Sequence, residues 1–226
     1  MPNYEDILNT AFPQHTYSNT IRALREGIAI GDDAVKGVPI LDTPVGRDIR
    51  GLIRRAGVMS RLHELCQSGD LPFISEFSQM PIGSWHWLKL SSGECCGYLV
   101  RTPDKETFPA DTPNQQDRRH SNQIELFEDP KVVPLSKAQY FSAWLCYGAT
   151  RNGALTHALW GLPSGGEEEN WLIRRDILNA VRATAPVTKN LEKPKVDPRQ
   201  VMKLRDDVQK MIKDRDKAGR EFGDEG

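Results

Sequence analysis

Two apolar segments joined by an Asn-Gly pair constrain the fold of this chain more than any other feature. Together they span residues 139–163, with Asn152-Gly153 between them. Asn-Gly is typical of a type I′ hairpin turn, in which both central residues need positive φ. Such a turn predicts the cross-strand pairs Arg151–Ala154, Tyr147–Ala158 and Leu145–Trp160. Because both faces of this hairpin are largely apolar, we expect it in the middle of a sheet covered on both sides.

Composition narrows the class of protein. The chain has 226 residues, a formal charge of −1 and 38% hydrophobic residues, which predicts a folded core domain rather than a disordered chain. No overall positive field attracts nucleic acid or membrane, so any such attraction must come from a local patch. The four cysteines stand without a secretory signal. We therefore expect a cytoplasmic protein with reduced thiols and no membrane span.

Helical signals dominate the part of the chain before residue 70. Asn3 predicts the cap of a first helix, and a second helix is expected to end at Gly27. The best-marked helix covers residues 44–68, with Thr43 at its cap and Gly69 after its last turn. Its apolar residues return at helical spacing and predict one broad apolar face, made of Ile49, Leu52, Ile53, Ala56, Met59 and either Leu62 or His63.

Strand signals follow. Ser92-Gly93 predicts the turn of a second hairpin, and the polar residues 102–123 predict a loop. Residues 171–181 predict an amphipathic helix. The expected strands are residues 85–90, 95–101 and 124–127, together with the two strands of the central hairpin.

The sequence thus predicts an α+β fold with N-terminal helices, a central antiparallel sheet of about five strands built on two hairpins, and C-terminal helices. We expect a core domain over residues 1–185, a Pro- and Lys-rich linker over 186–198, and a C-terminal helix and tail over 199–226. That last helix repeats apolar residues at alternating intervals of three and four. Its seam would suit a protein partner or self-association, and consists of Val201, Leu204, Val208 and Met211.

A stripe of arginines on the 44–68 helix gives the first functional hypothesis. Its members are Arg47, Arg50, Arg54 and Arg61. With a turn at Gly57 this segment resembles a degenerate helix-turn-helix motif, in which Arg61 and Gln67 would face a nucleic-acid groove. The sequence therefore predicts a nucleic-acid-binding accessory or regulatory protein that grips the phosphate backbone. A single amphipathic helix with a solvated basic face explains the same pattern.

The polar loop carries the second hypothesis. Near its end, Arg118, Arg119 and His120 follow one another, and two guanidinium groups with an imidazole can hold a phosphate. These residues would add contacts to nucleic acid or, alternatively, form the site of an enzyme for a phosphorylated or nucleotide substrate. A solvated loop without a ligand is the simpler explanation. A third possibility is a protein-interaction module that uses the C-terminal helix.

The sequence gives little support for nucleophilic catalysis or metal binding, and it does not identify catalytic residues. The expected registers place His86 opposite Leu99 and His157 opposite Gly148, so neither histidine faces a cysteine. His63 and Cys66 would supply only two zinc ligands. The sequence also lacks a Gly-rich phosphate loop, a His-Glu-x-x-His motif and a Gly-x-Ser-x-Gly motif. We therefore predict neither a metal nor a cofactor.

Overall fold

A computed structural model describes residues 3–79, 85–110, 112–122, 140–166, 169–184 and 209–210. These residues form two compact units. The sheet unit contains residues 3–22 and the described residues from 63 to 184, and the helix unit contains residues 23–62 with 209–210. Within the described ranges, no helix is long and apolar enough to cross a membrane.

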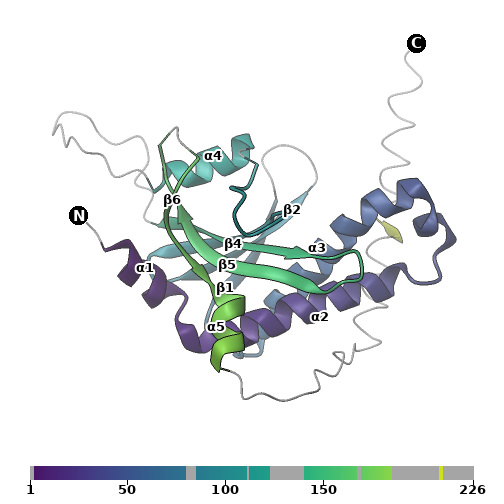
Figure 1. Cartoon of the computed structure of the whole chain (residues 1–226), viewed down its shortest axis with the longest axis horizontal. Coiled ribbons are helices and arrows are strands. Elements are labelled where there is room, and N and C mark those ends of the chain that lie inside the picture. The colour runs from purple at the N-terminus through teal and green to yellow at the C-terminus, as the bar shows by residue number, and fades with distance from the viewer. Residues whose placement is uncertain are drawn as a thin grey trace, which may run out of the picture. The chain divides into compact units, whose positions relative to one another are not determined.

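The sheet unit is built on a six-stranded sheet in sequence order (Figure 1). Its strands are β1 (Ile74–Gln79), β2 (His86–Ser92), β3 (Cys95–Arg101), β4 (Phe141–Ala149), β5 (Leu155–Pro163) and β6 (Trp171–Asp176). Neighbouring strands are antiparallel except β3 and β4, which are parallel. The sheet is therefore mixed, and the expectation of a purely antiparallel sheet is wrong. A parallel pair needs a long crossover connection, and the chain between β3 and β4 provides one.

Three helices belong to the sheet unit and two others run through both units. The first group is α1 (Tyr4–Ala11), α4 (Pro113–His120) and α5 (Ile177–Thr184), and the second is α2 (Tyr17–Val35) and α3 (Pro44–Gln67). Short 3-10 turns cover Gln14–Thr16 and Pro39–Asp42. The predicted cap of α1 is confirmed, since the Asn3 side chain accepts hydrogen bonds from the amides of Glu5 and Asp6.

The central hairpin forms as predicted. Tyr147 pairs with Ala158 and Leu145 pairs with Trp160, so the expected register is confirmed. Seven consecutive residues in the middle of β4 are buried, which is the pattern of a strand covered on both faces.

The turn of this hairpin differs from the prediction. Only Gly153 of the two turn residues has positive φ, and the Thr150 amide donates to the Ala154 carbonyl. This is the geometry of a three-residue loop, so Ala154 does not face Arg151. Such a loop would shift the register by one residue, but the extra residue Thr156 on β5 forms a bulge that restores it.

The second hairpin also forms, with a shifted register. Its turn residues are Gly93 and Glu94 rather than Ser92 and Gly93. Moving the turn by one residue changes every cross-strand partner by two, so the predicted opposition of His86 and Leu99 is wrong. A shift by two leaves each side chain on its expected face.

Three other elements differ from the prediction. Strand β1 was not expected because its residues are mostly polar and exposed, as suits the edge of a sheet. The helix predicted over residues 171–181 is β6 followed by α5, because Asp176 accepts from the Asn179 amide at 2.9 Å and starts the helix only there. The polar loop contains α4, which opens with a capping box of Thr112 and Gln115.

The helix unit consists of two helical segments in very close contact. Glycines allow this approach: a Cβ added to Gly27 of α2 would lie 2.4 Å from the Val58 Cα of α3. A Cβ on Gly57 would lie 2.3 Å from the Gly27 carbonyl oxygen. Both glycines are needed for close backbone approach and not for termination. Consequently α2 continues past Gly27, and α3 is one unbroken helix, so a helix-turn-helix with its turn at Gly57 is wrong.

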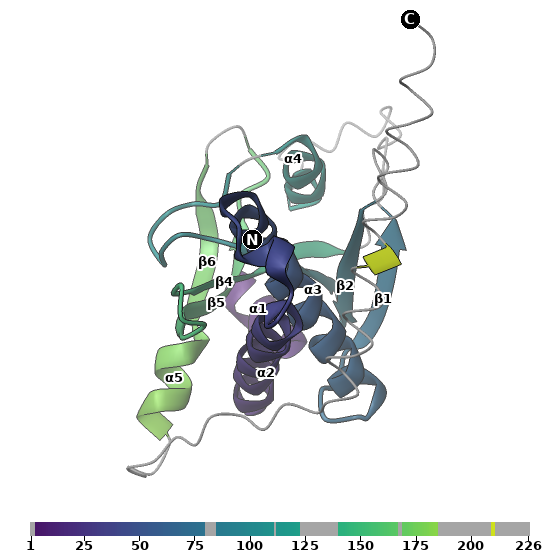
Figure 2. The same ribbon diagram turned by 90° about the vertical axis from the view of Figure 1, so that its right-hand side faces the viewer.

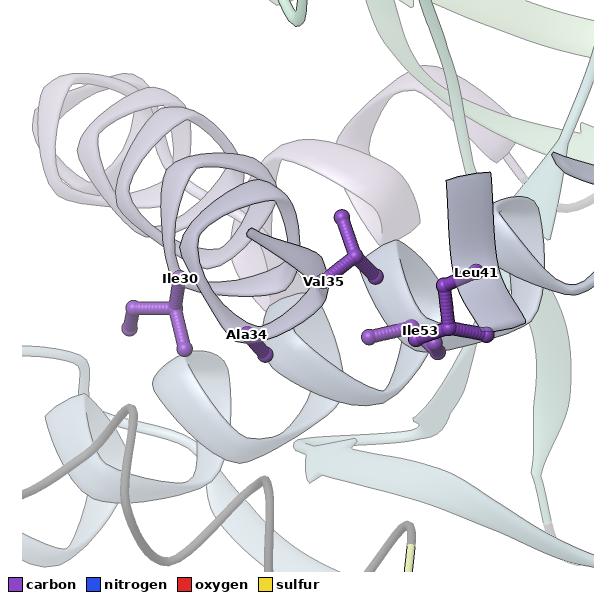
Figure 3. Packing of buried hydrophobic residues seen from close by; sticks show 5 residues of the cluster. All are labelled: Ile30, Ala34, Val35, Leu41 and Ile53. Carbon is purple, nitrogen blue, oxygen red and sulfur yellow. The ribbon is translucent and has the colours of Figure 1, made fainter. Parts of the chain in front are cut away.

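An aliphatic cluster fills the far end of this unit (Figure 3). Its buried members are Ile30, Ala34, Val35, Leu41 and Ile53. The ends of α3 agree with the prediction, because the Thr43 hydroxyl accepts from the Gly46 amide at 3.1 Å and Gly69 has positive φ.

Several predicted segments lie outside the described residues. They are the strand at 124–127, the linker at 186–198 and most of the C-terminal helix over 199–226. Of that helix only Gln209 and Lys210 are described, and both are helical.

Candidate functional site

The sheet has two faces with different coverings. Figures 1 and 2 show α1 and α4 on opposite sides of it. One face, called the Trp160 face, is closed by Phe12, whose ring stacks on Trp160 with centroids 3.8 Å apart. Trp160 is completely buried, and Gly97 leaves room for its ring. Around Trp160 this face therefore belongs to the protein's core.

The opposite face, called the Trp144 face, is covered over β4 to β6 and at Val100 of β3. We call this region the closed half. Phe108 packs there between two tryptophans, 5.4 Å from the Trp144 centroid and 5.1 Å from the Trp171 centroid. A tight aromatic cluster therefore seals the strands under the segment that connects β3 to β4.

Two of the predicted site residues belong to this seal. Arg119 is buried and donates to the carbonyls of Ser164, at 3.1 Å, and of Gly166. His120 Nδ1 lies 3.1 Å from the Gly165 carbonyl oxygen. Their polar groups thus bond to the backbone that follows β5, and they hold α4 in place.

Asn122 completes the seal. Its side-chain amide donates to the carbonyls of Ser142 and Pro163, both at 2.8 Å, and its carbonyl accepts from the Ser142 amide at 2.6 Å. One buried side chain therefore joins the start of β4 to the end of β5. Such a satisfied buried group fixes the path of the chain over the sheet.

His157 lies at the other end of the closed half. Its ring covers Gly148, as the predicted register implies, and its two nitrogens lie 2.7 Å from the Thr102 hydroxyl and 2.9 Å from the Thr156 hydroxyl. Burial lowers the pKa of His157, although the nearby carboxylates act in the opposite direction. The imidazole is therefore held neutral inside the protein.

The remaining part of the Trp144 face, over β1, β2 and the residue just before β4, carries exposed apolar and aromatic side chains. We call it the open half. Ile74 is 76% exposed, Trp85 53% and Tyr140 46%. The ammonium group of Lys89 lies 5.9 Å from the centre of the Tyr140 ring. Aromatic planes and a positive charge therefore share one surface.

Arg118 forms the boundary between the two halves. Its guanidinium carbon lies 3.6 Å from the centre of the Trp87 ring and 4.1 Å from that of Tyr98. The two rings meet nearly at right angles, so the cation fits the corner between them. Burial raises the pKa of Tyr98, which keeps its hydroxyl protonated. This predicted site residue thus places a positive charge beside the aromatic side chains of the open half.

The arginine stripe of α3 faces α2 in the helix unit. Arg54 is buried and contacts both carboxylate oxygens of Asp32, at 2.8 and 2.9 Å, and Arg50 contacts the same carboxylate at 3.0 Å. Arg61 lies 2.5 Å from Glu26. Gln67 is exposed at the end of α3, while the side chain of Arg47 lies outside the description. The stripe therefore turns toward acidic side chains, and the apolar Leu52 is partly exposed.

The thiols are poorly suited to nucleophilic chemistry. Cys95, Cys96 and Cys146 are buried. Burial raises the pKa of Cys95 to about 12 and raises those of Cys66 and Cys146. A protonated thiol is a weak nucleophile and a weak metal ligand. Among the described residues, no group of three or more His, Cys, Asp or Glu side chains is placed to hold a metal ion.

The sequence analysis missed the aromatic residues of the open half. A signal was present, because Trp85, Trp87 and Lys89 recur at intervals of two and must share one face of an extended strand. Tyr140 carries no such pattern, since only the parallel pairing of β3 with β4 brings it to this surface.

Comparison of the chain with protein-family models, with curated proteins and with solved structures gives no match.

Proposed function

We propose that this protein binds single-stranded nucleic acid on the open half of the Trp144 face. The observation that carries the proposal is the stacking of Arg118 on Trp87 and Tyr98, on the same face of the sheet as the exposed rings of Trp85 and Tyr140. Exposed rings offer planes on which unpaired bases stack, with only weak dependence on sequence. Lys89 and Arg118 add positive charge beside those planes, as a phosphate backbone requires.

The geometry favours this surface over the arginine stripe. A duplex-reading helix must present its cations to a groove, whereas Arg54 is buried against Asp32 and Arg61 is bonded to Glu26. The proposal therefore keeps nucleic acid as the partner but moves the contact from α3 to the sheet.

The geometry favours binding over catalysis as well. Arg119 and His120, two members of the Arg/His group on which the enzyme hypothesis depends, bond to the backbone between Ser164 and Gly166. Burial raises the pKa of the Cys95 and Cys146 thiols, so these two stay protonated near neutral pH.

Fluorescence anisotropy with labelled single-stranded DNA, RNA and duplex DNA tests the proposal. We expect binding to single strands at low salt, weakened by about 1–3 kcal/mol in Trp85→Ala and in Tyr140→Ala, because each change removes one stacking plane. The matched control is Phe77→Ala. Phe77 is 42% exposed but points to the opposite face of the sheet, where its ring contacts His63.

Two outcomes would contradict the proposal. One is the absence of binding to any of the three ligands at low salt. The other is binding that Phe77→Ala weakens as much as Trp85→Ala does, since the open half would then have no special part in it. A preference for duplex that only the α3 arginines affect would return the contact to the basic helix.

A further inference from the structure

Strand β1 forms one edge of the sheet, and no described strand lies beyond it. All of its residues pair with β2 in a regular register without a bulge. Its side chains are exposed on both faces of the sheet, Ile74 on one and Phe77 on the other. A regular edge strand of this kind presents a row of backbone hydrogen-bonding groups to any strand that approaches it.

The other edge of the sheet, strand β6, is protected. Its register with β5 is irregular at Pro163, and it ends in three charged residues before α5 begins. The Arg174 guanidinium donates to the Lys105 carbonyl and to the Glu106 carboxylate of the segment after β3. Bulges, charges and covering segments prevent strands from pairing edge to edge. Strand β1 has no proline, no bulge and a single charged residue, Glu76, so only one of the two edges is closed to pairing.

The alternation of hydrogen bonds in antiparallel strands decides which backbone groups of β1 point outward. The two-residue turn between β2 and β3 makes Ser92 and Cys95 a hydrogen-bonded pair. Counting back along β2 by this alternation, the backbone groups of Lys89 point toward β1, where Lys89 pairs with Glu76. The odd-numbered residues of β1 therefore direct their amides and carbonyls away from β2, and these residues are Ser75, Phe77 and Gln79.

We propose that β1 pairs with β1 of a second copy of this chain, antiparallel and about a two-fold axis at Phe77. In this register Phe77 lies opposite Phe77 of the partner subunit, and Ser75 lies opposite Gln79 of the partner subunit. Each of these pairs joins outward-directed residues, so each exchanges two backbone hydrogen bonds. The contact uses the same strand on both copies, as the interface of a symmetric dimer does.

Charge and overlap favour the axis at Phe77 over the other positions along β1. This axis places Glu76 opposite Ser78 of the partner subunit. An axis at Glu76 would place two carboxylates directly opposite each other, which destabilises a strand pair. An axis at Ser75 or Ser78 would pair only three residues of β1 with the second copy. The Phe77 axis therefore combines a long overlap with the absence of a like-charge pair within β1.

This pairing would also place the two open halves side by side. Opposite residues of a strand pair point to the same face, so the Trp144 faces of both copies lie on one side of the joined sheet. Because β1 borders the open half in each copy, the two open halves adjoin across the axis. The pairing itself rests on β1 alone and does not depend on the proposed function.

Analytical ultracentrifugation of the full-length protein tests the pairing. We expect the mass to rise from monomer to dimer with protein concentration, because one short strand makes a weak contact. Ser78→Glu should raise the dissociation constant about fivefold, since it sets a carboxylate opposite Glu76 on both sides of the axis. The matched control, Ser78→Lys, should lower it by a similar factor. Gln79→Pro should weaken the dimer too, because proline removes an outward amide and leaves the pairing with β2 intact.

A charge swap tests the register itself. Glu76→Lys combined with Ser78→Glu should restore dimerisation, because opposite charges again face each other across the axis. Hydrogen–deuterium exchange locates the contact, since the amides of Phe77 and Gln79 should exchange more slowly as protein concentration rises. Thermal melting shows whether each variant is folded.

Three outcomes would overturn the proposal. The first is a wild-type protein that stays monomeric at every concentration. The second is a dimer whose dissociation constant is the same in Ser78→Glu and Ser78→Lys, since the contact would then lie elsewhere. The third is a charge swap that stays as weak as Ser78→Glu in folded protein, which would exclude the register centred on Phe77.

Discussion

One row of paired residues crosses the Trp144 face from its open half to its closed half. The row contains Glu76, Lys89, Tyr98, Trp144 and Gly161. At the closed end, Trp144 is fully buried under Phe108. At the open end, Lys89 lies over the ring of Tyr140, which is partly exposed. The strands are continuous, so the difference follows from where the described part of the connection between β3 and β4 packs, with Phe108 against Trp144 and Trp171.

The two arginines at the end of α4 show what this difference means for individual side chains. Arg119 turns toward the closed half and is buried among backbone carbonyls. Arg118 turns toward the open half and stacks on two rings. Two neighbouring arginines therefore have different roles. The sequence motif, which contains both, does not show which arginine has which role.

The largest expected contrast is between two tryptophans of this face. Trp144→Ala should lower the free energy of unfolding by about 3–5 kcal/mol, because it leaves a cavity in a packed cluster. Trp85→Ala should lower it by less than about 1 kcal/mol, since that ring is mostly in water. Urea melts followed by circular dichroism measure both. Equal losses would show that the open half is as tightly built as the closed half.

The next contrast separates the two arginines. Arg119→Met should lower the free energy of unfolding by about 1.5–3 kcal/mol, because it removes charged hydrogen bonds and leaves carbonyls unsatisfied. Arg118→Met should lower it by about 1 kcal/mol but weaken nucleic-acid binding, which Arg119→Met should leave unchanged in folded protein. Melts and anisotropy on the same samples make the comparison. If Arg119→Met weakened nucleic-acid binding and Arg118→Met did not, the binding surface would be the closed half and not the open half.

A smaller effect concerns the salt dependence of binding. Lys89→Ala should reduce the slope of log affinity against log salt by about one phosphate contact. Arg50→Ala should not change that slope, because Arg50 faces Asp32 in the helix unit. Titrations at four or more salt concentrations measure the slope. A change with Arg50→Ala alone would favour the basic stripe of α3 as the phosphate-binding surface.

The smallest expected effect is a pH dependence of stability from the closed half. Burial lowers the pKa of His157, so the unfolded chain takes up a proton at higher pH than the folded protein does. Stability from this group is complete above the unfolded pKa of about 6.5 and is lost as pH falls below it. His157→Gln should therefore lose less stability than the wild type between pH 7.5 and pH 5 in urea melts. Parallel losses in the two proteins would rule out this assignment.

Elements with signals from adjacent residues were predictable from the sequence. The helix of residues 44–67 was recognisable because Thr43 and Gly69 act on the nearest turns, and the Asn3 cap works within three residues. The register of the central hairpin agrees with the prediction although its turn does not, because the bulge at Thr156 offsets the three-residue loop. Such signals depend on neighbours in the chain.

The partner that each surface meets depends on contacts between segments far apart in the chain. The direction of the α3 arginines depends on Asp32 and Glu26, which belong to another helix. Gly27 was predicted to end a helix, because the residues next to it in the sequence do not reveal that the backbone of α3 packs against it. The roles of the residues in the candidate site depend on such distant contacts too. Arg118, Arg119 and His120 were identified by type, but their roles depend on which half of a face each one meets, and a parallel pairing between segments far apart in the chain sets that boundary.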